Sequence, residues 1–218
     1  MPRGTLLLTA GAASVLAVLG IACSHASPNS IAAVEAPHID RSRAALDAWL
    51  ARIPGAETGK ISRIDDDAVR AVFLNRRFYV IRFMRFPRAQ QVPRPLKLEN
   101  LVAVRPDGSV ELHTDLEALK KFLKAELPPV RDAANGRNAA IASLRLAEEY
   151  YQDGFYTFDN PEGSVSVIRQ GAYLVGQARS VVTRGGTGQT TVKLTFDPPG
   201  KVELIEIEGK VRPDVRTR

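Results

Sequence analysis

Apolar side chains recur at the spacing of an α-helix in three segments of the chain, residues 40–53, 114–127 and 132–152. Pro54-Gly55 follows the first segment and Pro128-Pro129 the second, and both pairs are signals that end a helix. The second segment begins with Thr114 and Glu117, which have the spacing of a capping box that satisfies free backbone N–H groups. The pattern therefore predicts three helices, with Thr114 as the N-cap of the second.

Short apolar or alternating runs between and after these segments predict antiparallel strands. Beyond residue 155, Val192, Leu194 and Phe196 alternate with polar residues, which is typical of a strand with one buried face. In the run 78–86, aromatic residues occur at both odd and even positions, as expected for a central strand that is covered on both faces. The predicted strands of the first half are 71–74, 78–86, 101–104 and 110–112, and the predicted turns of the second half are 161–163, 185–188 and 197–200.

The two halves of the chain resemble each other when one is displaced by about 92–95 residues. Three pairs of segments then match in the same order: 44–49 with 139–144, 73–85 with 167–179, and 106–112 with 198–204. A repeated order at a nearly constant offset predicts a tandem duplication.

The predicted fold class is α+β, with two tandem units that are each a helix packed on an antiparallel sheet of about four strands. The expected units are residues 39–131 and 132–212, with a linking helix between them and a disordered tail at 213–218. In the order of its elements, each unit is similar to the cystatin-like folds. That likeness concerns architecture and carries no function.

The N-terminal 22 residues have the pattern of an export signal, because Arg3 is followed by an uncharged run rich in Leu, Val, Ala and Gly. The run ends in Leu19-Gly20-Ile21-Ala22-Cys23, which resembles the lipobox of bacterial lipoprotein signal peptides, although Gly20 stands where Leu is usual. The resemblance implies cleavage before Cys23, lipidation of Cys23 with acyl chains such as palmitate, and a membrane anchor on the extracytoplasmic side. Residues 23–38 are rich in Ser, Ala, Pro and Asn and are expected to form a flexible tether.

Two other outcomes are open for this segment. Ser24-His25-Ala26 is an acceptable site for ordinary signal cleavage, which would leave a secreted or periplasmic protein. A run of about 20 uncharged residues is also just long enough to stay in the membrane as an uncleaved anchor. Cys23 is the only cysteine, so no disulfide can form within the chain. A lone thiol in an exported protein is a hazard unless it is acylated, removed with the signal or paired between chains, which favours the two cleaved outcomes.

Positive charge dominates one stretch of the predicted domain. The whole chain has a formal net charge of +6, and residues 68–98 contain no acidic residue. The predicted anion-binding residues are Arg76, Arg77, Arg82, Arg85 and Arg88. Their partner would be an anionic lipid or an envelope polymer, since export argues against nucleic acid. The alternative is that these arginines flank a covered central strand and extend to water from its ends. The oligomeric state is left open.

Sequence motifs give no sign of catalysis, a metal site or a cofactor. There is no Gly-x-Ser-x-Gly, and Asp65-Asp66-Asp67 lacks the spacing of a calcium loop and is expected to form a charged turn ahead of a strand. Glu148-Glu149 is expected to be solvated. Residues 90–94 resemble the Gln-x-Val-x-Gly hairpin of cystatins, but Arg94 replaces the closing Gly, so protease inhibition is not expected. The sequence thus favours a non-enzymatic binding or interaction role, with an extracytoplasmic hydrolase of dispersed active site as the alternative.

Overall fold

The computed structural model describes residues 41–84, 89–152 and 156–213. The predicted signal peptide, the predicted tether with Cys23, Arg85, Arg88 and residues 214–218 of the predicted tail lie outside the described residues. Among the described residues, no helix combines the length and the apolar character needed to cross a bilayer.

The first sheet, sheet A, consists of four antiparallel strands in chain order. The N-terminal helix (residues 41–50) covers one face, where its Leu46 and Leu50 pack against alternate residues of the central strands. The opposite face carries Phe78 and Val80 toward a second apolar core. The strands are β1 (Lys60–Arg63), β2 (Arg77–Arg82), β3 (Glu99–Val104) and β4 (Val110–His113). The prediction of a central strand with two buried faces is therefore confirmed for β2.

Three helices, α2 (Asp67–Val72), α3 (Leu116–Glu126) and α4 (Ala133–Glu148), form a layer behind sheet A. In each, the residue before the first turn is an aspartate whose side chain accepts hydrogen bonds from free backbone N–H groups. These caps are Asp66, Asp115 and Asp132.

The aspartate caps correct two predictions. The run 71–74 is the end of α2 and the residues after it, not a strand, because Asp66 starts a helix that the short apolar run conceals. The N-cap of α3 is Asp115 rather than Thr114, because the Asp115 carboxylate accepts the hydrogen bond from the Ala118 N–H. The turn 65–67 accordingly precedes a helix and not a strand.

The second sheet, sheet B, is also antiparallel and has the order β5-β7-β8-β9, with β6 paired to the other half of the same edge of β7. Helix α4 packs along one face so closely that a Cβ on Gly176 would lie 3.0 Å from the carbonyl oxygen of Gly136. The strands are β5 (Thr157–Asp159), β6 (Val165–Gln170), β7 (Tyr173–Arg184), β8 (Gly186–Phe196) and β9 (Val202–Pro213). The predicted turns at 161–163 and 197–200 separate strands of this sheet as expected, whereas the predicted turn at 185–188 is confined to Gly185.

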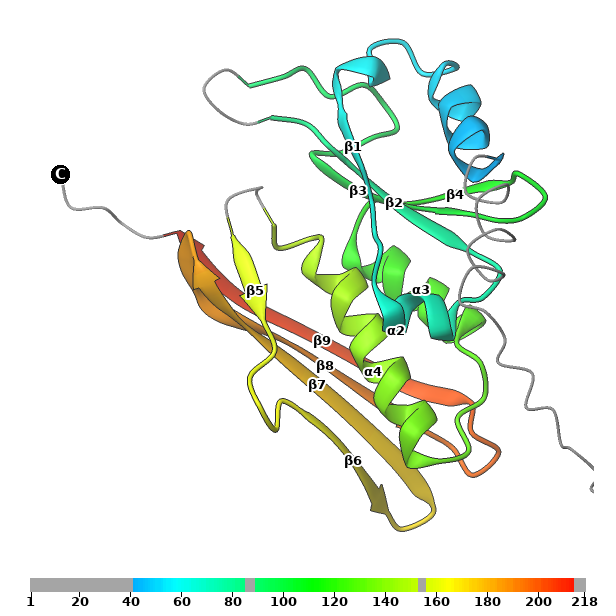
Figure 1. The fold of residues 1–218 in the computed structure, drawn as a ribbon, viewed down its shortest axis with the longest axis vertical. Coiled ribbons are helices and arrows are strands. Elements are labelled where there is room, and N and C mark those ends of the chain that lie inside the picture. The colour runs from blue at the N-terminus through cyan, green and yellow to red at the C-terminus, as the bar shows by residue number, and fades with distance from the viewer. Residues whose placement is uncertain (1–40, 85–88, 153–155, 214–218) are drawn as a thin grey trace, which may run out of the picture.

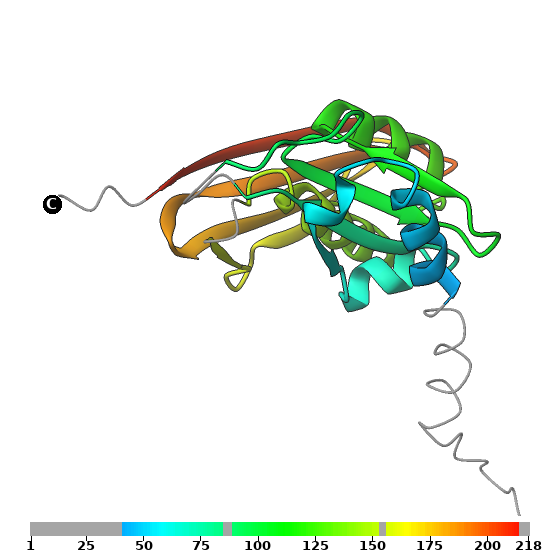
Figure 2. The same cartoon turned by 90° about the horizontal axis from the view of Figure 1, so that it is seen from above.

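The layers follow one another as N-terminal helix, sheet A, helices α2 to α4, and sheet B (Figures 1 and 2). The larger apolar core lies in the helical layer and includes residues of both sheets, such as Phe78 and Phe196. The α+β class predicted from the sequence is confirmed, and in each half a helix precedes an antiparallel sheet and packs on it.

The element order bears on the predicted duplication. The hairpin between β3 and β4 and the hairpin between β8 and β9 occupy corresponding places in the two halves. Helix α2 has no counterpart among the described residues of the second half. In addition, Phe73-Leu74 lies beyond that helix whereas its proposed match, Val167-Ile168, lies in β6. The duplication therefore stays a prediction.

Candidate functional site

Arg76, Arg77 and Arg82 of the basic stretch are engaged within the fold. The Arg76 guanidinium lies 5.3 Å from the centroid of the Phe122 ring, forms an ion pair with Glu126 and is 3.5 Å from a carboxylate oxygen of Glu111. Arg77 is 8% exposed and donates a hydrogen bond from Nη1 to the Arg76 carbonyl oxygen. The charge of Arg76 is thus paired with carboxylates, and Arg77 is buried.

Arg82, at the end of β2, forms an ion pair with Glu149 just beyond α4 and lies 3.5 Å from the side-chain oxygen of Gln152. Arg82 therefore links sheet A to α4. It does not form a shared, solvent-accessible group of cations with Arg76. The assignment of Arg76, Arg77, Arg82, Arg85 and Arg88 to anion binding stays a prediction, and the geometry of the three described members gives it no support.

A group of ionisable side chains gathers at the C-terminal end of α4, where helices and both sheets meet. Glu148 is 2% exposed, and its carboxylate is 2.9 Å from Nη1 of Arg145. Arg145 also lies 3.3 Å from the Asp66 carboxylate, which caps α2. Burial raises the pKa of Glu148, and the interactions with Ser180 and Arg145 offset this effect only in part. This group is referred to below as the α4 ion cluster: Asp66, Arg82, Arg145, Glu148 and Glu149.

The α4 ion cluster corrects the prediction that Glu148-Glu149 is solvated. The sequence signal was hidden because the two acidic residues follow an alanine-rich helix whose exposed and buried faces differ little in polarity. Both sheets contribute partners, so burial at this point is a consequence of tertiary packing. The Glu148 carboxylate is therefore held inside the fold beside Arg145.

Glu149 gives the fold a measurable pH dependence. Burial raises the pKa of Glu149 from 4.5 to about 6, with Arg82 opposing the shift and Glu148 adding to it. Because the folded state holds this proton more tightly, stability falls as the pH rises from about 4.5 to 6, by about 2 kcal/mol for a shift of this size.

The Glu149→Gln variant lacks this titration. Its unfolding free energy minus that of the natural protein is therefore expected to rise by about 2 kcal/mol between pH 4.5 and 7. Urea unfolding followed by circular dichroism measures the difference, and Glu162→Gln, at an exposed glutamate between β5 and β6, is the control for the substitution itself. A difference that stays flat or falls would contradict the assignment.

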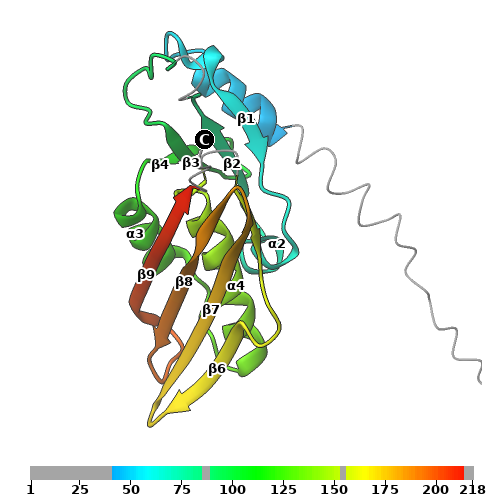
Figure 3. The same cartoon turned by 90° about the vertical axis from the view of Figure 1, so that its left-hand side faces the viewer.

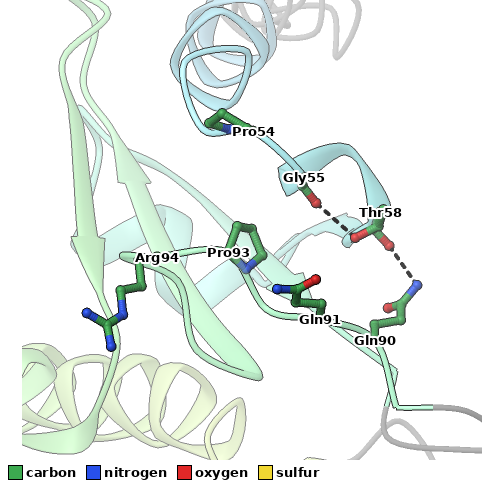
Figure 4. A pocket seen from close by; sticks show the side chains of 7 residues that line it. All are labelled: Pro54, Gly55, Thr58, Gln90, Gln91, Pro93 and Arg94. Carbon is green, nitrogen blue, oxygen red and sulfur yellow. Dashed lines mark hydrogen bonds between the residues drawn. The ribbon is translucent and has the colours of Figure 1, made fainter.

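A cleft of about 470 Å³ lies between the turn after the N-terminal helix and residues 90–94 (Figure 4). The amide of Gln90 donates to the Thr58 carbonyl oxygen at 3.1 Å and accepts from the Met84 N–H at 2.7 Å, so it fastens this segment to the start of sheet A. The residues around the cleft are Pro54, Gly55, Thr58, Gln90, Gln91, Pro93 and Arg94. Among the described residues, this lining contains no carboxylate, imidazole or thiol that could act as a general base, and its one hydroxyl, that of Thr58, donates to the Gly55 carbonyl oxygen at 2.9 Å.

The described helices leave the outer face of sheet B uncovered, as Figure 3 shows with the strands in front of α4. Ile168 and Leu204 are each 50% exposed and Tyr173 is 40% exposed, at the end of the sheet nearest the hairpin between β8 and β9. The strand register places Ile168, Val175, Thr195 and Leu204 in one row across four strands.

Charged side chains of this outer face include more cations than anions. Lys193 pairs with Glu206 at 2.7 Å on the neighbouring strand. The cations are Arg179, Lys193, Lys210 and Arg212, and the anions are Asp159, Glu206 and Glu208. Between them stand hydroxyl and amide side chains of β7 and β8: Gln177, Gln189, Thr191 and Thr195.

No family model, no curated protein and no solved structure matches this chain. The functional argument therefore rests on the geometry of this fold. Among the described residues there is also no group of three or more His, Cys, Asp or Glu side chains arranged to hold a metal ion.

Proposed function

We propose that this protein is an exported, lipid-anchored component of the cell envelope that binds an anionic glycan polymer through the outer face of sheet B, without catalysing a reaction. The observation that supports it is the uncovered sheet face, which combines an excess of cations with hydroxyl, amide and exposed apolar side chains.

Each part of that face matches a feature of an anionic glycan. Arg179 and the cations of β9 would pair with carboxylate or phosphate groups along the polymer. Threonine and glutamine side chains offer hydrogen bonds to sugar hydroxyls, and the exposed Tyr173 offers an apolar surface to the C–H face of a sugar ring. A flat sheet suits an extended polymer better than a small molecule, which needs a concave site.

The rival assignment, a hydrolase with a dispersed active site, has less support. The described lining of the cleft in Figure 4 contains no general base. Glu148, the glutamate with the most buried carboxylate, is paired with Arg145 in the α4 ion cluster. The lipid anchor follows from the lipobox resemblance of residues 19–23. Each buried methylene of an acyl chain contributes about 0.8 kcal/mol of membrane affinity, so several chains would hold the protein firmly.

Co-sedimentation with cross-linked polygalacturonate, a polymer of uronic acid, tests the binding proposal, with cross-linked dextran as the neutral comparison. The form beginning at Ser24 is expected to pellet with the acidic polymer alone and to be released by high salt. The Tyr173→Ala/Arg179→Gln variant should bind about tenfold more weakly, a loss of ~1.4 kcal/mol for the two side chains together.

The matched control is Leu74→Ala/Lys121→Gln, which removes one exposed apolar side chain and one exposed cation away from the outer face. Equal loss in both variants would contradict the proposal, because it would mean that net charge alone governs binding. Binding to anionic liposomes but to neither polymer would point to a lipid surface instead.

A further inference from the structure

Strand β9 is an edge of sheet B, and its outer backbone groups are not paired with any described strand. Helix α3 packs against β9 near the beginning of the strand, whereas Figures 1 and 2 both show the second half running past the helices. An exposed edge of this length offers a row of backbone N–H and C=O groups to another strand.

The charges on this edge are arranged symmetrically about Gly209. Glu206 and Glu208 precede the glycine, and Lys210 and Arg212 follow it, all four on the outer face because they pair with outer-face residues of β8. The four side chains are exposed. On the opposite face, Ile207 and Val211 flank Gly209 at equal distance along the strand.

We propose that two copies of the protein join through their β9 edges as an antiparallel pair, with Gly209 opposite Gly209 on the twofold axis. In this register Glu208 lies opposite Lys210 of the second copy, and Glu206 lies opposite Arg212 of the second copy. Each contact occurs twice, so the pairing places four pairs of opposite charges across the new boundary.

Neighbouring registers lack this match. If one strand slides along the other by two residues, Glu208 lies opposite Glu208 of the second copy. In the other direction, Lys210 lies opposite Lys210 of the second copy. Like charges directly opposite each other are unfavourable. Glu206 already contacts Lys193 through Oε2, which leaves its other oxygen for Arg212 of the second copy. Charge complementarity therefore selects both the partner, a second copy, and the register.

Gly209 also explains why the axis can pass through this point. A Cβ at this position would lie 2.2 Å from ring atoms of Tyr151, so the ring of Tyr151 occupies the inner side and no side chain projects at the axis. The twofold axis is perpendicular to the sheet, so the outer faces of both copies lie on the same side. The pairing does not depend on the proposed function.

Sedimentation equilibrium of the full chain in density-matched detergent tests this inference. The paired segment is short, so a reversible dimer in the micromolar range is expected. The all-acidic edge, Lys210→Glu/Arg212→Glu, and the all-basic edge, Glu206→Lys/Glu208→Lys, should each weaken association at least about tenfold because four attractive pairs become repulsive. An equimolar mixture of the two variants should associate again.

The matched control is Arg169→Glu/Lys201→Glu, which changes the net charge as much as the all-acidic variant does, at exposed positions outside residues 206–212. It should associate like the natural protein. Circular dichroism of each variant establishes that it is folded. A monomer at all concentrations, a dimer indifferent to both edge variants, or a mixture that stays monomeric would each overturn the inference.

Discussion

Replacing Arg145 by methionine is expected to lower the free energy of unfolding by about 3–5 kcal/mol near neutral pH, because it leaves Glu148 buried and without its cation. The same change removes the 3.3 Å contact with Asp66, so the cap of α2 also loses a partner. Since stabilities of small proteins are about 5–15 kcal/mol, the loss is a large fraction of the total.

The cost of this substitution should depend on pH with a known sign. Burial already raises the pKa of Glu148, and without Arg145 the charged form is disfavoured further. Protonation of Glu148 removes the unpaired charge, so the destabilisation should be smaller at pH 4.5 than at pH 7.5. Urea unfolding of Arg145→Met at the two pH values measures this.

Two further variants identify the cause. Arg145→Met/Glu148→Gln should recover part of the lost stability at pH 7.5, because both charges are gone. Arg137→Met removes the other arginine of α4, which is exposed and donates a hydrogen bond to the Val165 carbonyl oxygen at 3.3 Å, so a change within about 1 kcal/mol is expected. A loss from Arg145→Met that is independent of pH would contradict the assignment to Glu148.

Replacing Phe78 by alanine is expected to cost about 3–5 kcal/mol through lost burial and the cavity that remains. Phe78 is 1% exposed, and its ring is 5.2 Å from Phe73 and 5.7 Å from Phe122, in edge-to-face arrangements with both. These three rings come from β2, the end of α2 and α3, so their contact joins sheet A to the helical layer.

Thermal and urea unfolding of Phe78→Ala measure the loss, and Phe78→Leu should show a smaller loss in the same direction. Leu74→Ala, at a side chain that is 72% exposed, is expected to change stability by less than about 0.5 kcal/mol. Similar values for Phe78→Ala and Leu74→Ala would mean that the aromatic contact does not hold the two layers together.

The sequence predicted the elements whose signal is local. The helix predicted over residues 132–152 corresponds to α4, and aromatic residues at both odd and even positions of 78–86 predicted that β2 is covered on two faces. Helix α2 was missed because its apolar residues, such as Val69 and Val72, are few and β-branched, and only the Asp66 cap distinguishes the run from a strand.

The candidate site was less predictable than the fold. The burial of Glu148 depends on Arg145 one turn earlier and on packing against Asp66 and β7, which are distant in sequence. The sequence predicted a basic surface that includes Arg76 and Arg82. Their carboxylate partners, Glu126 and Glu149, lie in distant segments that only the fold brings close to these arginines. The outer face of sheet B emerges from the strand register, which no local pattern specifies.

The proposed place of the protein in the cell envelope depends on export and on anchoring at Cys23. Mass spectrometry of the intact mature protein, purified from the membrane of a cell that makes it, tests this most directly. The proposal predicts a chain that begins at Cys23 and carries the added mass of acyl chains. A chain that begins after Ala26, or one that retains residues 1–22, would contradict lipid anchoring.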